Sequence, residues 1–144
     1  VAELLRYMKD KTIKDVKPLC TKTGGFVSLL GTSDARSVSD RAMDGDKTAK
    51  RAWDAMIYQI IKYIGAMSTV LHGKVDGILL GGGMVYNKEL VKQISEACSF
   101  IAPVYAYPGE FELEAMNAGA ARVLSGEETA REYTGVPRWN GFEV

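Results

Sequence analysis

The chain has 144 residues, with 18 basic and 18 acidic side chains and no net charge, and 47% of its residues are hydrophobic. This composition is typical of one soluble domain and argues against intrinsic disorder. Balanced charge argues against a nucleic-acid partner and against a membrane partner bound through a polybasic patch. The sequence starts at Val1, inside an apolar run, so we expect the polypeptide to begin further upstream.

Hydrophobic periodicity and turn residues predict the elements in chain order. The first elements are a helical segment over 1–11, an amphipathic piece from Thr12 that Pro18 disrupts, a strand over Phe26–Leu30, and a short helix through Asp40–Met43 capped by Ser33 or Asp34. A long helix over Lys47–His72 and a strand over Val75–Leu80 follow. The last elements are a helix capped by Asn87, a strand over Pro103–Tyr107, and helices over Glu110–Leu124 and Glu127–Tyr133. Alternating strands and helices predict an α/β fold with parallel strands and right-handed crossovers. Ligands of such sheets bind at the carboxyl ends of the strands.

Three consecutive glycines, Gly81-Gly82-Gly83, follow the second predicted strand. Glycines there allow a ligand to approach the backbone, and the start of the next helix favours phosphate. The alternative is a tight turn that needs glycine for packing. The segment matches neither a Walker A loop nor a dinucleotide fingerprint. A side chain at Gly82 is expected to block a nucleotide without unfolding the chain.

Glu110, Glu112 and Glu114 open the last long helix, whose periodicity predicts an inward apolar face made of Leu113, Met116, Ala120, Val123 and Leu124. Carboxylates at a helix start usually interact with the helix dipole. At the carboxyl end of a strand they are also candidates for holding Mg²⁺.

The segment Ser33-Asp34-Ala35-Arg36 follows the first predicted strand. A carboxylate and a guanidinium two residues apart can bind ribose hydroxyls and adenine or phosphate edges. The alternative is a helix cap with a surface ion pair. Trp53 on the long helix is expected in the core.

The remaining reactive side chains indicate no catalytic site in this chain. Cys20 and Cys98 have no metal or redox spacing and are predicted to be buried free thiols of a cytoplasmic protein, although a disulfide stays open. The one histidine, His72, provides no multi-histidine zinc site and little material for a nucleophile triad.

Several motifs together resemble butyrate kinases, which belong to the acetate kinase group. The matching segments are Gly24–Arg36, Tyr58–Leu71, Val75–Gly83, Ser99–Val104, Tyr107–Glu110, Glu114–Met116 and Gly119–Leu124. The likeness extends from about Val1 to Tyr133. It implies an incomplete second lobe of the ribonuclease-H-like, actin-like ATPase fold, with residues 1–23 as a helical lead-in, 24–133 as a partial nucleotide-binding lobe and 134–144 as a tail.

The resemblance also implies an activity and its site. The parent enzyme is expected to transfer a phosphoryl group between ATP and butyrate or a branched short-chain acid, with Mg²⁺. Nucleotide contacts are expected in two segments: Asp34, Ala35 and Arg36, and Gly81, Gly82, Gly83, Met84 and Val85. Glu110 or Glu112 matches the acidic residue that holds Mg²⁺.

The segments that carry catalytic residues in the family have no match here. We therefore expect the isolated chain to be inactive, because phosphoryl transfer needs groups on several sides. A homo-oligomer is expected, since apolar surface of a partial lobe needs covering. Two alternatives are an inert binding or self-associating fragment and a divergent dinucleotide-binding domain.

Overall fold

The computed structural model describes residue 6 and residues 8–136. The chain divides into two compact units, one up to Gly109 and one from Glu110 onward. Most of the helix predicted over 1–11 lies outside the described residues, and residues 8–10 form a turn. The organisation into 1–23, 24–133 and 134–144 remains a prediction.

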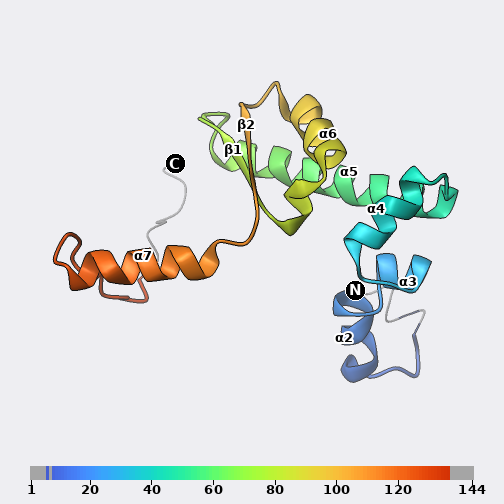
Figure 1. Ribbon diagram of the computed structural model, residues 1–144. Coiled ribbons are helices and arrows are strands. Elements are labelled where there is room, and N and C mark those ends of the chain that lie inside the picture. The colour runs from blue at the N-terminus through green and yellow to red at the C-terminus, as the bar shows by residue number, and fades with distance from the viewer. Residues whose placement is uncertain (1–5, 7, 137–144) are drawn as a thin grey trace. The chain divides into compact units, whose positions relative to one another are not determined.

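The first unit is built from helices and two parallel strands (Figure 1). Its elements are α2 (Ile13–Thr21), α3 (Phe26–Leu30), α4 (Ala35–Met43), α5 (Lys47–Val70), β1 (Ile78–Gly82), the 3-10 helix η1 (Gly83–Tyr86), α6 (Lys88–Cys98) and β2 (Val104–Pro108). β1 and β2 pair in parallel, with Ile78 opposite Val104 and Gly82 opposite Pro108. The predicted strand–helix–strand unit is therefore confirmed, with β1 shifted toward the glycines.

The long helix α5 begins and ends through identifiable backbone contacts. Asp46 caps it, because its carboxylate accepts hydrogen bonds from the N–H groups of Thr48 and Ala49 at 2.9 and 3.0 Å. Beyond Val70 the chain turns through Gly73, which has φ +73° and donates its N–H to the Ser68 carbonyl at 2.9 Å. The predicted helix is confirmed and ends at Val70 rather than His72.

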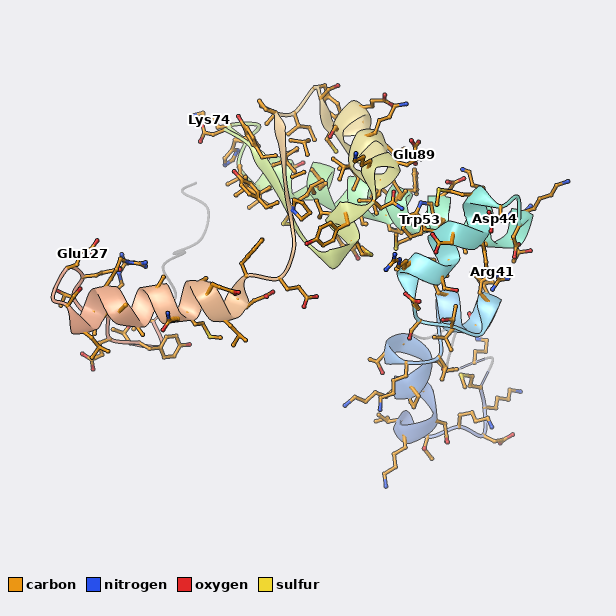
Figure 2. The ribbon with its side chains drawn as sticks, in the orientation of Figure 1. Arg41, Asp44, Trp53, Lys74, Glu89 and Glu127 are labelled. Carbon is orange, nitrogen blue, oxygen red and sulfur yellow. The ribbon has the colours of Figure 1, made fainter. Side chains whose placement is uncertain are left out.

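The core of this unit joins α4, α5, β1 and α6. Its buried side chains are Val38, Ala49, Trp53, Ile57, Ile78, Leu90, Ile94, Cys98 and Ala102. Trp53, labelled in Figure 2, is 5% exposed, as predicted. Each large apolar side chain buried in this way contributes about 1.5–3 kcal/mol, so the cluster holds α4 and α6 against α5.

The segment Phe26–Leu30 is a helix, so the predicted strand is wrong. A short apolar run does not by itself distinguish a strand from a buried helical turn. Phe26 and Leu30, four residues apart, both pack against the core, whereas Leu29 is 60% exposed. Gly31, in the left-handed region at φ +73°, ends the helix.

Two expectations for the first residues are also wrong. α2 continues through Pro18 to Thr21: the proline lacks a backbone donor, but its carbonyl accepts the N–H groups of Lys22 and Thr23, both at 2.8 Å. The start of α2 is stabilised by Asp15, whose carboxylate accepts from the N–H and hydroxyl of Thr12, both at 2.8 Å. Cys20 is exposed, whereas Cys98 is buried as expected.

The second unit contains α7 (Glu112–Leu124). Leu113, Met116 and Leu124, predicted to face inward, are 76%, 63% and 87% exposed. The helix predicted over 127–133 is absent, since the chain beyond Gly126 is irregular up to residue 136. In the described part of the chain, no helix has both the length and the apolarity needed to cross a bilayer.

Candidate functional site

The glycine turn at the end of β1 leaves its backbone accessible. Gly82 has φ +91° and ψ 179°, a region that essentially only glycine adopts. A Cβ atom at Gly82 would meet no heavy atom within 4 Å. A Cβ atom at Gly81, which lies outside the left-handed region, would lie 4.0 Å from the Tyr107 carbonyl oxygen. Both α-carbons therefore face open space, and Gly82 is also required by the backbone.

The chain from this turn to α6 differs from the predicted strand-to-helix junction. The four residues of η1 come between β1 and α6, so the glycines do not form the start of α6. That start is capped by Asn87, whose side-chain oxygen accepts the N–H of Leu90 at 2.9 Å. The glycines therefore offer an open backbone at the end of β1 and the start of η1 rather than at the start of α6.

The two residues after the glycines are unequally accessible. Met84 is 42% exposed, whereas Val85 is 7% exposed. The side chain of Met84 is available to a ligand, whereas Val85 is buried.

Asp34 caps α4, which confirms one of the two caps predicted for this helix, Ser33 or Asp34. Its carboxylate accepts the N–H of Arg36 at 3.0 Å, and its own N–H donates to the Thr32 hydroxyl at 3.1 Å. These bonds fix the backbone of the segment, and the exposed Asp34 side chain has a second oxygen for a ligand.

Arg36 lies in the first turn of α4 and is exposed. Among the described residues its guanidinium makes no hydrogen bond or ion pair, so the surface ion pair considered for Asp34 and Arg36 does not form. Ala35 is half-buried against the core. The segment thus presents a free cation beside a backbone that is held in place.

A part-buried hydrogen bond joins the residues that follow the two candidate nucleotide segments. The side-chain N–H of Asn87 donates to the hydroxyl of Ser39 at 2.6 Å, across 48 residues of sequence. Ser39 is 4% exposed and belongs to α4. Sequence reasoning identified Asn87 as a cap but missed Ser39, because a serine within a helix carries no signal of a long-range partner.

Two cavities of the first unit lie near these elements. One, of about 390 Å³, is lined by Cys20, Lys22, Gly25 and Ser33, next to Asp34 in sequence. The other, of about 440 Å³, is almost wholly apolar and lies between the second half of α5 and the start of β1, with Ile60, Ile64, Met67, Val75, Ile78 and Ile101 in its wall.

Glu110 and Glu112 belong to the second unit. Glu112 is the first residue of α7, and both side chains are exposed. No group of three or more His, Cys, Asp or Glu side chains gathers among residues 6 and 8–136. Mg²⁺ is commonly held by one or two carboxylates together with waters and substrate phosphates, so two exposed glutamates suit a metal that arrives with a nucleotide.

The buried thiol is unsuited to nucleophilic chemistry. Burial raises the pKa of the Cys98 thiol, which disfavours the reactive thiolate. Cys98 thus belongs to the core rather than to a reactive site.

The family model described as "Acetokinase family" matches residues 2–133. The chain is 45% identical over 128 residues to butyrate kinase 2 of Clostridium acetobutylicum, covering 89% of this chain and 35% of that protein. It is 46% identical over 127 residues to the probable butyrate kinase 2 of Caldanaerobacter subterraneus subsp. tengcongensis, covering 88% of this chain and 36% of that protein. The chain thus spans about a third of the length of these curated relatives.

A solved structure of an acetate kinase is similar to this chain in fold. The crystal structure of Porphyromonas gingivalis acetate kinase superposes with a TM-score of 0.60 at 25% identity, over 69% of this chain and 25% of that one. The predicted fold class, part of an α/β lobe of the actin-like ATPase kind, is confirmed. The family match extends over nearly the whole sequence, and the chain belongs to the acetokinase family.

Proposed function

We propose that this chain is the nucleotide-binding part of a carboxylate kinase of the butyrate kinase type. The observation that carries the proposal is the part-buried bond between Ser39 and Asn87, which joins α4 just after Asp34–Arg36 to the residue just after Gly81–Val85 and Tyr86, next to both segments for which nucleotide contacts are expected. An open glycine backbone on one side and a free guanidinium on the other suit an adenosine and its phosphates.

The proposed division of labour follows from the exposed groups. The backbone of Gly81, Gly82 and Gly83, with Met84 and Val85, lies against adenosine. Asp34, Ala35 and Arg36 form the other contact segment, in which the Asp34 carboxylate can accept from a ribose hydroxyl. The guanidinium of Arg36 can donate to phosphate oxygens in a charge-assisted bond.

The proposed reaction is reversible phosphoryl transfer. A carboxylate oxygen of butyrate or a branched short-chain acid forms a bond to the γ-phosphorus of ATP, the bond to the β,γ-bridging oxygen breaks, and ADP leaves with that electron pair. Bound Mg²⁺ supplies charge neutralisation at the phosphates. Glu110 or Glu112 would hold this ion together with the nucleotide. Support for the acid comes from the butyrate kinases at 45% and 46% identity.

Three further expectations belong to the same proposal. The isolated chain is inactive, since positioning and charge stabilisation must come from several sides. It works in the cytoplasm, where ATP is available. It forms a homo-oligomer, because Leu79, Tyr105 and Tyr107 are 70%, 48% and 58% exposed in the first unit.

Calorimetric titration of the chain with ADP tests nucleotide binding. Gly81→Val tests the site, because a side chain there meets no backbone strain. We expect saturable binding to the wild type and a loss of more than about tenfold in affinity for the variant, whereas Gly65→Val, where space is also open, retains binding. No heat of binding to the folded wild-type chain would contradict the proposal.

The reaction is tested on the whole polypeptide that carries this chain. Hydroxylamine trapping of acyl phosphate, with MgATP and acids from acetate to hexanoate, is expected to give product with butyrate or a branched acid. Absence of product with every acid would overturn the proposed reaction.

A further inference from the structure

We infer that Ser39 and Asn87 form a positioning pair that holds the Asp34–Arg36 segment and the glycine turn at the spacing a nucleotide requires. This inference rests on the proposed nucleotide-binding function. Neither side chain is expected to touch the ligand. Their role is to connect the two elements from which the ligand contacts project.

Each residue of the pair lies close in sequence to one contact segment. Ser39 follows Arg36 by less than one turn of α4, and Asn87 follows Gly82 and Gly83 immediately after η1. An α-helix is rigid over one turn, so a displacement of Ser39 moves the whole first turn of α4 with it. The bond at 2.6 Å therefore fixes a position next to one segment relative to a position next to the other.

Asn87 makes two contacts at once. Its side-chain oxygen accepts the N–H of Leu90 and its side-chain N–H donates to Ser39. The cap orients the amide plane, and this orientation directs the donor at the Ser39 hydroxyl. Figure 2 labels Glu89 in the first turn of α6, directly after this cap.

Because Ser39 is buried, its hydrogen bond to Asn87 is not easily exchanged for a bond to water. Ser39 is 4% exposed, and its neighbour Val38 is fully buried in the core cluster. When a buried polar group loses its hydrogen-bond partner, water does not easily take the partner's place, and the unpaired group costs free energy. Apolar packing by Val38 and Leu90 holds α4 and α6 together, but such packing is non-directional and permits small slides. The hydrogen bond between Ser39 and Asn87 fixes one position of α4 relative to α6 among those that such slides would allow.

The test measures ADP affinity at a temperature well below unfolding, so that stability and positioning are separated. Ser39→Ala removes the acceptor, and Asn87→Ser keeps a capping oxygen but is too short to reach Ser39. Each is expected to weaken ADP binding about fivefold, the loss of one ordinary hydrogen bond. The double variant is expected to lose no more than either single one, since both remove the same bond.

Two matched variants separate positioning from general structure. Ser95→Ala removes another half-buried hydroxyl, bonded within α6 to the Val91 carbonyl, and is expected to leave ADP affinity unchanged. Asn87→Asp keeps the cap and presents a second oxygen to the Ser39 hydroxyl, so it is expected to bind ADP as the wild type does. The same change on the Ser39→Ala background is expected to bring no recovery.

The outcomes distinguish this inference from the proposed function. Wild-type binding with unchanged affinity in folded Ser39→Ala would overturn the positioning role and leave the function standing. Additive losses in the double variant would also overturn it. Absence of ADP binding by the wild-type chain would overturn the function and the inference together.

Discussion

The guanidinium of Arg41 donates two hydrogen bonds to one carboxylate oxygen of Asp46, at 3.0 and 2.6 Å, while the other oxygen of Asp46 caps α5. Arg41 also donates to the Leu30 carbonyl at 3.5 Å. One aspartate thereby connects the end of α4 to the start of the longest helix. Figure 2 labels Arg41, with Asp44 beside it on the turn between the two helices.

This arrangement predicts an acid-dependent stability. The backbone N–H of Ala49 and the Arg41 guanidinium lower the pKa of Asp46, so its contribution is present above the unfolded pKa of about 4 and is lost as the pH falls through the folded value. Asp46→Asn keeps a capping side chain but removes the charge. We expect thermal unfolding midpoints to show a smaller acid-induced decrease in this variant below about pH 4.

Asp44→Asn is the matched control, since among the described residues the Asp44 carboxylate accepts no hydrogen bond. Its acid dependence should equal that of the wild type. Equal profiles for the Asp46 variant and the wild type would contradict the assignment.

The stacking of Phe26 on Trp53 predicts that the short helix α3 stabilises the first unit. The two ring centroids lie 6.4 Å apart with an interplanar angle of 13°. Phe26→Ala removes this contact from the edge of the core, and we expect a loss of about 2 kcal/mol in the free energy of unfolding. Leu29→Ala on the exposed face of α3 should change it by less than about 0.5 kcal/mol. Denaturant titration measures both, and equal losses would contradict the helical face.

The backbone at Gly82 predicts a stability cost that was not expected from the sequence. Gly82→Ala forces a side chain into a glycine-only conformation and should destabilise the chain by about 1–3 kcal/mol. Gly81→Ala should be neutral or stabilising by up to about 1 kcal/mol. A side chain at Gly82 thus strains the fold besides obstructing a ligand. Equal unfolding free energies for the two variants would show that Gly82 is not strained.

Substitution of two nearby glutamates of α7 tests the proposal for the residue that holds Mg²⁺. Glu112→Gln is expected to weaken Mg²⁺-dependent ADP binding more than Glu114→Gln, because Glu112 is proposed as a candidate metal ligand and Glu114 is not. Both variants lose one exposed charge near the helix N-terminus, so the dipole effect is matched. Calorimetry with and without Mg²⁺ measures the difference. Equal effects would place the metal elsewhere.

Sequence reasoning found the elements whose signals are local. Hydrophobic periodicity predicted α5, and the apolar run before Gly81 predicted β1, although the strand extends two glycines further. Phe26–Leu30 was misassigned because a run of five residues with four apolar side chains fits a strand or a helical turn equally well, and only packing against Trp53 decides between them.

In the candidate site, too, features set by local sequence were predictable, and features set by the packing of distant elements were not. Asp34 and Asn87 were predictable as caps, since their side chains act on their own backbone. The partnership of Asn87 with Ser39 depends on how α4 and α6 pack, and no local pattern encodes that. The exposed stripe of α7 was predicted to be buried from its periodicity, which indicates an apolar face but not what covers it.

The most direct test of the nucleotide-binding claim is an amide chemical-shift titration of the isotope-labelled chain with ADP. We expect saturable shifts concentrated at Gly81–Val85 and Asp34–Arg36, the two segments that lie next in sequence to Asn87 and Ser39. Absence of shifts, or shifts confined to the apolar cavity walled by Ile60, Ile64 and Ile101, would contradict it.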